Sequence, residues 1–409
     1  MQHSRGLVVL AVLAALTLSL KAPAGDPAGA TTIGMKKYES RYYVIHTDLD
    51  TDATREAYIR MDAMAEEYHR RTKGFGRTIR RKLPFYLFRS REDYYLAGGV
   101  IGSAGMFIVG PRESKLMVFA GKKLSPYMWH TIQHEAFHQF AFAAISHRLP
   151  VWVNEGLAEY FGHGIFTGDD FVTGIVPPVR FERLKDAIKA KKLKPFRRIM
   201  SLSHFQWSAG MSMYNYDQAW SMIHFLVHGE EGKYVKPLST FISNISRGSA
   251  YEKAWVRSFG RDIDGFEKKC REWWLAQGKN PSADMDARAA FSTMTSFFAR
   301  SFSQRQRFES ADAFFKSARA GKLKFHKLDW LPPRLLSQHL PQAARLGKWT
   351  IETPPRKLPQ LVCQLEDGRK LVGTFAVRGG RVRRVSVKLV PKEEPKAPRK
   401  QPPSTRPAS

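Results

Sequence analysis

One short apolar segment constrains the fold of this chain more than any other feature. It reads His134-Glu135-Ala136-Phe137-His138, and its flanks (127–129 and 140–145) carry apolar residues at helical spacing without proline or glycine. Residues four apart stack on one face of a helix, so His134 and His138 can point at a single cation. Two imidazoles and a carboxylate are costly to bury unpartnered, and a metal ion is the simplest way to satisfy all three.

A second helical segment follows after a short loop and supplies a third ligand. Pro150 is expected to end the first helix a few residues after His147, and Asn154 to cap the second, with Glu155 in its first turn. The connection can bring Glu155 back against the two histidines. Two nitrogens, one oxygen and a fourth position open to water describe a catalytic zinc site rather than a structural one. Glu135 then lies beside the ligands as a general base.

Glu159 lies one turn after Glu155 and faces the same way. It either accepts the free ring N–H of His134 or His138, which would fix the tautomer of that ligand, or is an exposed helical carboxylate.

Three further histidines lie close to these segments in the sequence. His130, one turn before His134, is expected to support the ligands or to pack beside them. His147 and His163 lie in or near predicted loops and are expected to be surface residues. The predicted ligand set is therefore His134, His138 and Glu155.

With these residues the chain resembles the gluzincins, zinc peptidases with a His-Glu-x-x-His helix and a downstream glutamate ligand. The run 154–160 is similar to the corresponding helix of zinc aminopeptidases, and the run 216–226 resembles the helix that begins with their transition-state tyrosine. The likeness is greatest to the bacterial peptidase MA-like family, secreted proteins mostly without assigned substrates, over residues 36–277. It implies an orienting role for Glu159 and makes Tyr216 the donor to the oxyanion of the tetrahedral intermediate. Tyr214 is a competitor for that role, and simple packing at a helix start is the alternative for Tyr216.

The chain departs from the aminopeptidase pattern at residues 105–110. Aminopeptidases carry an acid in this glycine-methionine segment to hold the free amine of the substrate, but here it reads Gly-Met-Phe-Ile-Val-Gly. We therefore expect an endopeptidase rather than an aminopeptidase. An edge strand of this kind can pair with an extended substrate backbone.

The two ends of the chain and its charge bear on localisation and partners. An apolar run from Leu7 to Leu20, followed by an Ala-x-Ala-like site, is typical of a cleaved export signal; an uncleaved N-terminal anchor is the alternative. The formal net charge is +29. In an exported protein this favours an anionic envelope polymer, a membrane surface or an acidic substrate over nucleic acid. Basic residues gather at 180–198 and 369–389, where a solvated basic face is the simplest interpretation.

The sequence predicts an α+β fold, with a small N-terminal mixed sheet packed on a mainly helical zinc-peptidase domain and a small C-terminal β-unit. Strands are expected at 42–46, 83–88 and 115–119, helices at 55–72 and 287–320, and short strands after residue 346. Cys270 and Cys363 either form one disulfide or remain apart. The expected divisions are a signal peptide at 1–24, a linker at 25–35, the metallopeptidase domain at 36–280, a helical extension at 281–345, the β-unit at 346–390 and a disordered basic tail at 391–409.

These features predict an exported zinc peptidase that acts on a peptide or protein substrate. Zn²⁺ is held by His134, His138 and Glu155, with Glu135 as general base and Tyr216 sharing the oxyanion charge. The alternative is a non-enzymatic envelope-binding protein. In that case the metal site is structural or vestigial, and the basic C-terminal module binds. The sequence does not predict the oligomeric state.

Overall fold

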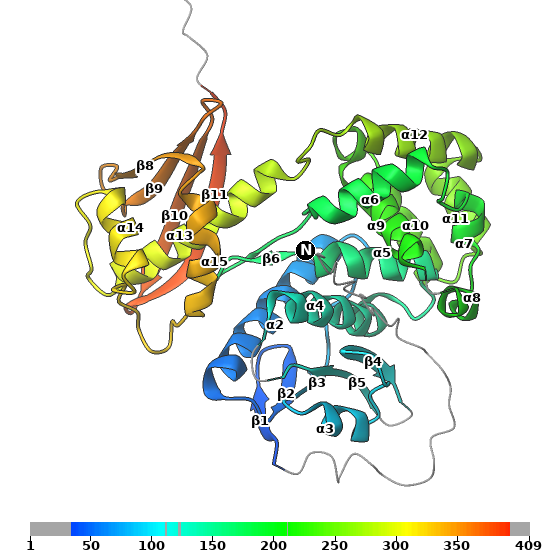
Figure 1. The fold of residues 1–409 in the computed structure, drawn as a ribbon, viewed down its shortest axis with the longest axis horizontal. Coiled ribbons are helices and arrows are strands. Elements are labelled where there is room, and N and C mark those ends of the chain that lie inside the picture. Colours follow the sequence, from blue (N-terminus) through cyan, green and yellow to red (C-terminus); the bar gives the residue numbers. More distant parts are fainter. Residues whose placement is uncertain (1–33, 111–112, 122–123, 211, 393–409) are drawn as a thin grey trace, which may run out of the picture. The chain divides into compact units, whose positions relative to one another are not determined.

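The computed structural model describes residues 34–110, 113–121, 124–210 and 212–392 (Figure 1). The predicted signal peptide and almost all of the predicted linker and basic tail lie outside these residues. The described part has the predicted α+β fold and divides between Ala289 and Ala290 into two compact units. Within the described residues, no helix is both long and apolar enough to cross a membrane.

The first unit begins with a five-stranded mixed sheet in the order β1-β2-β3-β5-β4. Its two central pairings, β2 with β3 and β3 with β5, are parallel, and the outer pairings are antiparallel. The first strand was predicted at 42–46, but that segment is the second strand and begins one residue later. The preceding strand is largely exposed and charged, so it lacks the apolar pattern that would have predicted it. The strands are β1 (Lys36–Glu39), β2 (Tyr43–Thr47), β3 (Leu83–Phe88), β4 (Gly105–Val109) and β5 (Ser114–Phe119).

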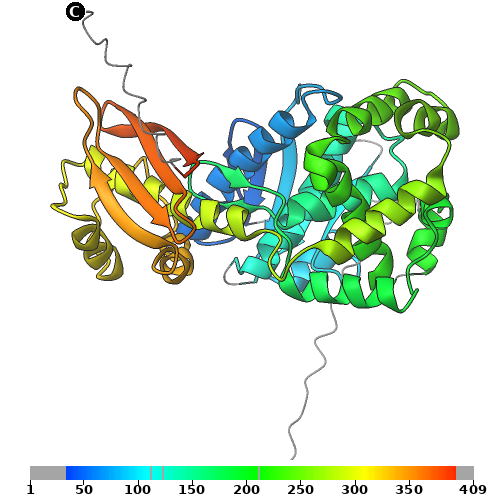
Figure 2. The ribbon, with the colours of Figure 1, turned by 90° about the horizontal axis from the view of Figure 1, so that it is seen from above.

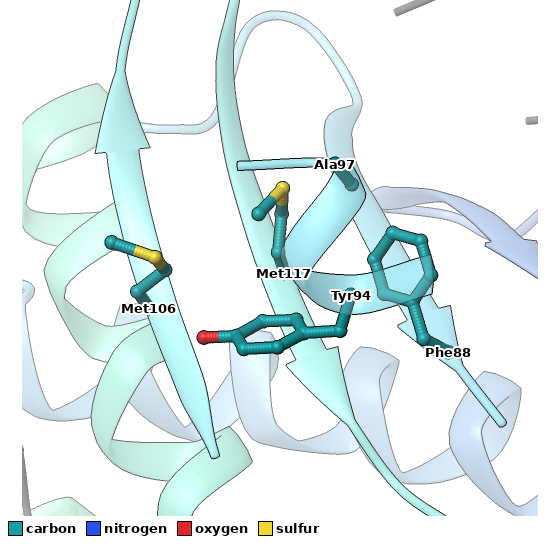
Figure 3. Close-up of a cluster of buried hydrophobic side chains, with 5 residues drawn as sticks. All are labelled: Phe88, Tyr94, Ala97, Met106 and Met117. Atoms are coloured by element: carbon teal, nitrogen blue, oxygen red, sulfur yellow. The ribbon is translucent and has the colours of Figure 1, made fainter. Parts of the chain in front are cut away.

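Helices cover both faces of this sheet (Figure 1). On one face lies α3 (Arg91–Leu96), whose Tyr94 is fully buried against Met106 of β4 and Met117 of β5 (Figure 3). On the other face lie α2 (Thr51–Thr72) and α4 (Pro126–Phe140). Since neighbouring residues of a strand face opposite sides, Gly105, Phe107 and Val109 of β4 face the α4 side, whereas Ile108 packs with Met106. The sheet therefore presents its β4 edge beside the predicted ligand helix.

The rest of the first unit is helical apart from one short antiparallel strand pair, β6 with β7. The helix α4 passes into one π-helical turn, η1 (Ala141–Ile145), and stops there, so the helix predicted to run past His147 ends before it. The helix α5 (Val151–Gly162) packs along both α4 and α9. The remaining elements are β6 (Ile165–Phe166), β7 (Phe171–Val172), α6 (Pro178–Lys189), α7 (Phe196–Met200), α8 (His204–Ala209), α9 (Met213–His228), η2 (Gly229–Gly232), α10 (Val235–Ser246), α11 (Tyr251–Phe259) and α12 (Ile263–Ala276).

The second unit is a four-stranded antiparallel sheet with helices, drawn in yellow to red in Figure 2. Gly373 allows close packing, since a Cβ there would come within 2.3 Å of Thr295 Oγ1. A single helix was predicted over 287–320, but it is interrupted at 304–310. Cys270 and Cys363 are buried, free thiols. The elements are α13 (Ala283–Ser303), which begins in the first unit, α14 (Ala311–Arg319), α15 (Pro333–Ala343), β8 (Gly347–Glu352), β9 (Gln360–Leu365), β10 (Lys370–Arg378) and β11 (Arg381–Val390).

Candidate metal centre

The helix α4 carries three of the predicted site residues into the interior. Ser125 caps it by accepting a hydrogen bond from the Met128 N–H at 3.1 Å, and proline occupies its first turn. His134, Glu135 and His138 are 1%, 2% and 4% exposed. Buried charged groups need partners, so the neighbours of these three side chains decide what the helix can do.

The helix α5 carries the third predicted ligand, but it starts earlier than predicted. Asn154 is not the N-cap, because Pro150 occupies that position and residues 151–153 form the first turn. These three apolar residues are buried, so packing overrides their modest helix propensity, and Glu155 lies in the second turn. Gly156 lets α5 approach α9 closely, since a Cβ there would come within 2.5 Å of the Ala219 carbonyl oxygen.

Three ligand atoms converge between α4 and α5. His134 Nε2 lies 3.1 Å from His138 Nε2, and Glu155 Oε2 lies 3.4 Å and 3.6 Å from these two nitrogens. Around a tetrahedral metal ion with bonds of about 2.0–2.2 Å, ligand atoms lie about 3.3–3.6 Å apart. Glu155 Oε2 is also buried without a hydrogen bond of good geometry in the described part of the chain. His134, His138 and Glu155 can therefore hold a metal ion.

The electrostatics of the cluster agree with this geometry. Burial alone would lower the pKa of both imidazoles, but Glu155 raises the pKa of His138, and Glu155 with Glu159 raises that of His134. Burial opposes ionisation of Glu155, yet His138 and His134 lower its pKa to about 2. The pocket thus favours positive charge beside Glu155, which a metal ion would supply.

Glu135 lies beside this cluster and is held by the edge strand β4. Its Oε2 accepts a hydrogen bond from the Phe107 N–H at 3.0 Å. Ala104 and Gly110 flank β4, and their backbones are hydrogen-bonded to Phe119 and Glu113 on the β5 side. By strand alternation Phe107 therefore directs its N–H to the free edge. Burial raises the pKa of Glu135, partly offset by the two ligand histidines. The carboxylate is thus positioned by a backbone group that the sequence pattern does not reveal.

Glu159 is 1% exposed, so the alternative of an exposed helical carboxylate is wrong. Its Oε1 lies 3.4 Å from His134 Nδ1, the ring nitrogen that faces away from the cluster. Its Oε2 accepts a hydrogen bond from Arg180 Nη1, and Arg180 Nε donates to Asp217 Oδ1 at 2.7 Å. The Arg180 guanidinium therefore links Glu159, which lies beside the candidate ligand His134, to Asp217 of α9. Asp217 follows Tyr216 directly and also binds Arg183.

Arg180 corrects the interpretation of residues 180–198 as a solvated basic face. Its side chain is buried and serves as a counter-ion for two carboxylates, whereas Arg183, one turn later on α6, is half-buried. A basic run in the sequence does not distinguish a buried cation from a solvated one. Helical spacing could have suggested that these two arginines share a face, but it could not have identified Asp217 as their partner.

His163 is also misassigned by the sequence, since it is not a surface residue. It caps the C-terminus of α5, 80% of its side chain is covered, and its Nε2 lies 2.6 Å from Arg180 Nη1. Burial, followed by His130 and Arg180, lowers its pKa, so the ring is neutral and its Nε2 accepts a hydrogen bond from the guanidinium. His130, Glu159 and His163 form a second group whose ligand atoms converge, but Arg180 donates to two of its members. His147 is exposed, as predicted.

Tyr216 lies in the first turn of α9 and is 5% exposed. Burial raises its pKa, and the charges of Glu155, Glu159 and Glu135 raise it further, so the phenol stays neutral within electrostatic range of the cluster. Its hydroxyl makes no hydrogen bond of good geometry within the ranges that the structure describes. A buried hydroxyl left in this state is available to a ligand. Tyr214, two residues earlier, is half-buried.

Comparison with known proteins identifies one matching region. Residues 129–247 match a family model described as a protein of unknown function, DUF1570. The match runs from α4 to the end of α10 and so includes every predicted site residue. No curated protein and no solved structure matched the chain.

Proposed function

We propose that this chain is an exported zinc-dependent peptidase that cleaves within peptide chains. One observation carries the proposal: two imidazole nitrogens and one carboxylate oxygen, all buried, lie 3.1–3.6 Å apart beside a second carboxyl group, that of Glu135. Histidine and carboxylate ligands in this number are those of hydrolytic zinc sites. The likeness to the peptidase MA-like family supports the assignment, and the apolar run at 7–20 supports export.

In the proposed mechanism His134, His138 and Glu155 hold Zn²⁺. When bound, the ion supplies Lewis acidity that makes water a nucleophile near neutral pH and polarises a carbonyl group. Glu135 takes a proton from the attacking water and returns it to the departing amine. The Phe107 N–H occupies Oε2 of this carboxylate, which leaves Oε1 for the transfer. The Tyr216 hydroxyl donates a hydrogen bond to the substrate oxygen as negative charge develops there.

The edge of β4 supports an endopeptidase rather than an aminopeptidase. The strand ends the sheet order, and its free edge lies beside Glu135. A free strand edge can accept an extended backbone from the middle of a chain. Residues 105–110 contain no acid that would bind the amino terminus of a substrate.

The test combines metal analysis with an unbiased peptide-library digest of purified protein. The Glu135→Gln variant should retain bound zinc and lose hydrolysis by about 10²- to 10⁴-fold, since the general base is gone. The exposed Glu252→Gln change on α11 is the matched control and should behave as wild type. Activity should also disappear with a chelator and return with zinc. Wild-type rates in Glu135→Gln would overturn the mechanism. Full activity in protein shown to contain no metal would overturn the function.

A further inference from the structure

A cavity of about 560 Å³ lies on the opposite side of α5 from the candidate metal centre. Leu157 and Phe161 line it, whereas Glu155 and Glu159 face the metal centre. Residues two apart on a helix differ in direction by about 200°, so the two sites use opposite faces of α5. The other walls come from the ends of α2 and α9 and from η2 and α10. The volume falls within the range of about 300–1,000 Å³ typical of small-molecule sites.

The inner walls of this cavity are largely apolar. Leu157 and Phe161 are almost fully buried, and Phe75, Val227, Val235 and Leu238 add to the apolar lining. Covering such walls with a hydrocarbon body is favourable at about 25 cal/mol per Å² of buried apolar surface. A strongly hydrated ligand would gain none of this energy.

Cationic side chains also line the cavity, and no carboxylate does. Arg71 shares Glu67 with Arg70, and Lys233 pairs with Glu230 outside the lining. The lining therefore carries three cations and no anion, and one of these cations, Lys236, has no ionic partner among the described residues. An anionic group lying near the lysines would replace solvent as their partner.

A polar pair completes the lining. The Tyr160 hydroxyl lies 3.0 Å from His228 Nε2, and Tyr160 is 2% exposed. Burial and the nearby Arg71 lower the pKa of His228 to about 4, so the ring is neutral near pH 7 and offers hydrogen bonding without charge. The cavity thus combines an apolar body, a neutral polar pair and a cationic side.

We propose that this cavity binds a small amphiphilic monoanion, one carboxylate on a hydrocarbon body. A neutral hydrocarbon would leave the positive side unpaired, and a polyphosphate would leave the apolar walls uncovered. The inference does not rest on the proposed peptidase activity. It concerns a site on the other face of α5.

The experiment titrates the full-length protein with 8-anilinonaphthalene-1-sulfonate and displaces this fluorescent anion with dodecanoate below its micellar concentration. Dodecanol, with the same chain and no charge, should need at least about tenfold higher concentration. Lysophosphatidylglycerol distinguishes a lipid headgroup from a free carboxylate, and weaker displacement than by dodecanoate is expected because its headgroup is larger.

Two variants test the location. Val227→Trp fills the cavity and should weaken dodecanoate binding at least about tenfold. The double change Lys233→Gln and Lys236→Gln keeps the cavity and should weaken dodecanoate about three- to tenfold while leaving dodecanol unchanged. The exposed Lys268→Gln change on α12 is the matched control.

Equal displacement by dodecanol and dodecanoate, or unchanged dodecanoate affinity in the folded lysine double variant, would overturn the proposal. Stronger displacement by lysophosphatidylglycerol would replace the free carboxylate by a lipid. Circular dichroism of each variant shows that it is folded.

Discussion

The two groups of histidine and glutamate around α4 and α5 contain the same kinds of ligand atom but differ in one neighbour. In the first group, His134, His138 and Glu155, the ligand atoms face one another. In the second, His130, Glu159 and His163, Arg180 donates to both the carboxylate and an imidazole. A guanidinium already supplies the positive charge that a metal ion would bring. Ligand type and spacing therefore do not define a metal site by themselves. The surrounding charges decide whether binding of a further cation is favourable.

The largest effect expected from this comparison is on metal binding. Glu155→Ala should weaken zinc binding on the order of 10³-fold, since one of three ligands is lost from a total binding free energy of about 10–16 kcal/mol. His163→Ala should leave one equivalent of zinc bound with little change. Competition with a chromophoric chelator measures both. Equal losses in the two variants would mean that the groups do not differ as proposed.

Replacing the cation of the second group tests why that group differs. Arg180→Met leaves Glu159 and Asp217 buried without their shared counter-ion, so the free energy of unfolding should fall by about 3–5 kcal/mol. Urea titration measures the loss, and Arg183→Met, at a half-buried site, should cost less. With excess zinc the folded Arg180→Met protein should bind a second equivalent. A stoichiometry that stays at one would show that the guanidinium is not what excludes the ion.

Catalysis should depend on the first group and on the hydroxyl that lies near it. Tyr216→Phe should lower kcat by about 10²-fold, since one donor to the developing oxyanion is lost, with little change in zinc affinity. Steady-state kinetics on a peptide found in the library digest measures the change. Tyr214→Phe is the matched control. A larger loss in that variant would transfer the role to Tyr214.

A third pair of histidines, on α9, shows how the pKa of an imidazole changes when it is buried and no carboxylate contributes to the shift. His224 and His228 lie with ring centroids 4.5 Å apart, and burial followed by mutual repulsion lowers the pKa of His224 to about 3. Burial and Arg71 lower that of His228 to about 4. Because both values lie below the unfolded value of about 6.5, the unfolded chain binds more protons between about pH 6.5 and 4. The contribution of these two histidines to the free energy of unfolding is therefore fully present above about pH 6.5. It is lost as the pH decreases through this window.

The expected slope is up to about 1.4 kcal/mol per pH unit for each histidine. His228→Gln should remove the part of this slope that His228 contributes. The urea midpoints at pH 7 and pH 4.5 should then differ less than in the wild type. The neighbours that face this pair are Arg71, the Tyr160 hydroxyl and the Gly174 carbonyl. An unchanged slope would assign the acid sensitivity to other groups.

Local sequence was enough to predict the main elements of the site. Helical spacing places His134 and His138 on one face, and the predicted strands of both larger sheets appear near their predicted positions, although β1 was not predicted. These features depend on periodicity and turn residues, which are local properties. The error at Asn154 has a tertiary cause, because packing of apolar residues 151–153 outweighs capping preference.

The sequence alone determined the α+β fold class and the convergence of His134, His138 and Glu155, because short-range periodicity and one short loop suffice for them. Only the tertiary structure decided which charges surround these residues. Arg180 reaches Glu159 from 21 residues away and Asp217 from 37, and Phe107 reaches Glu135 from 28. Such partners are chosen by the packing of α6, α9 and β4 around α4 and α5. A basic residue in a charged run carries no local mark of the carboxylate that it will neutralise.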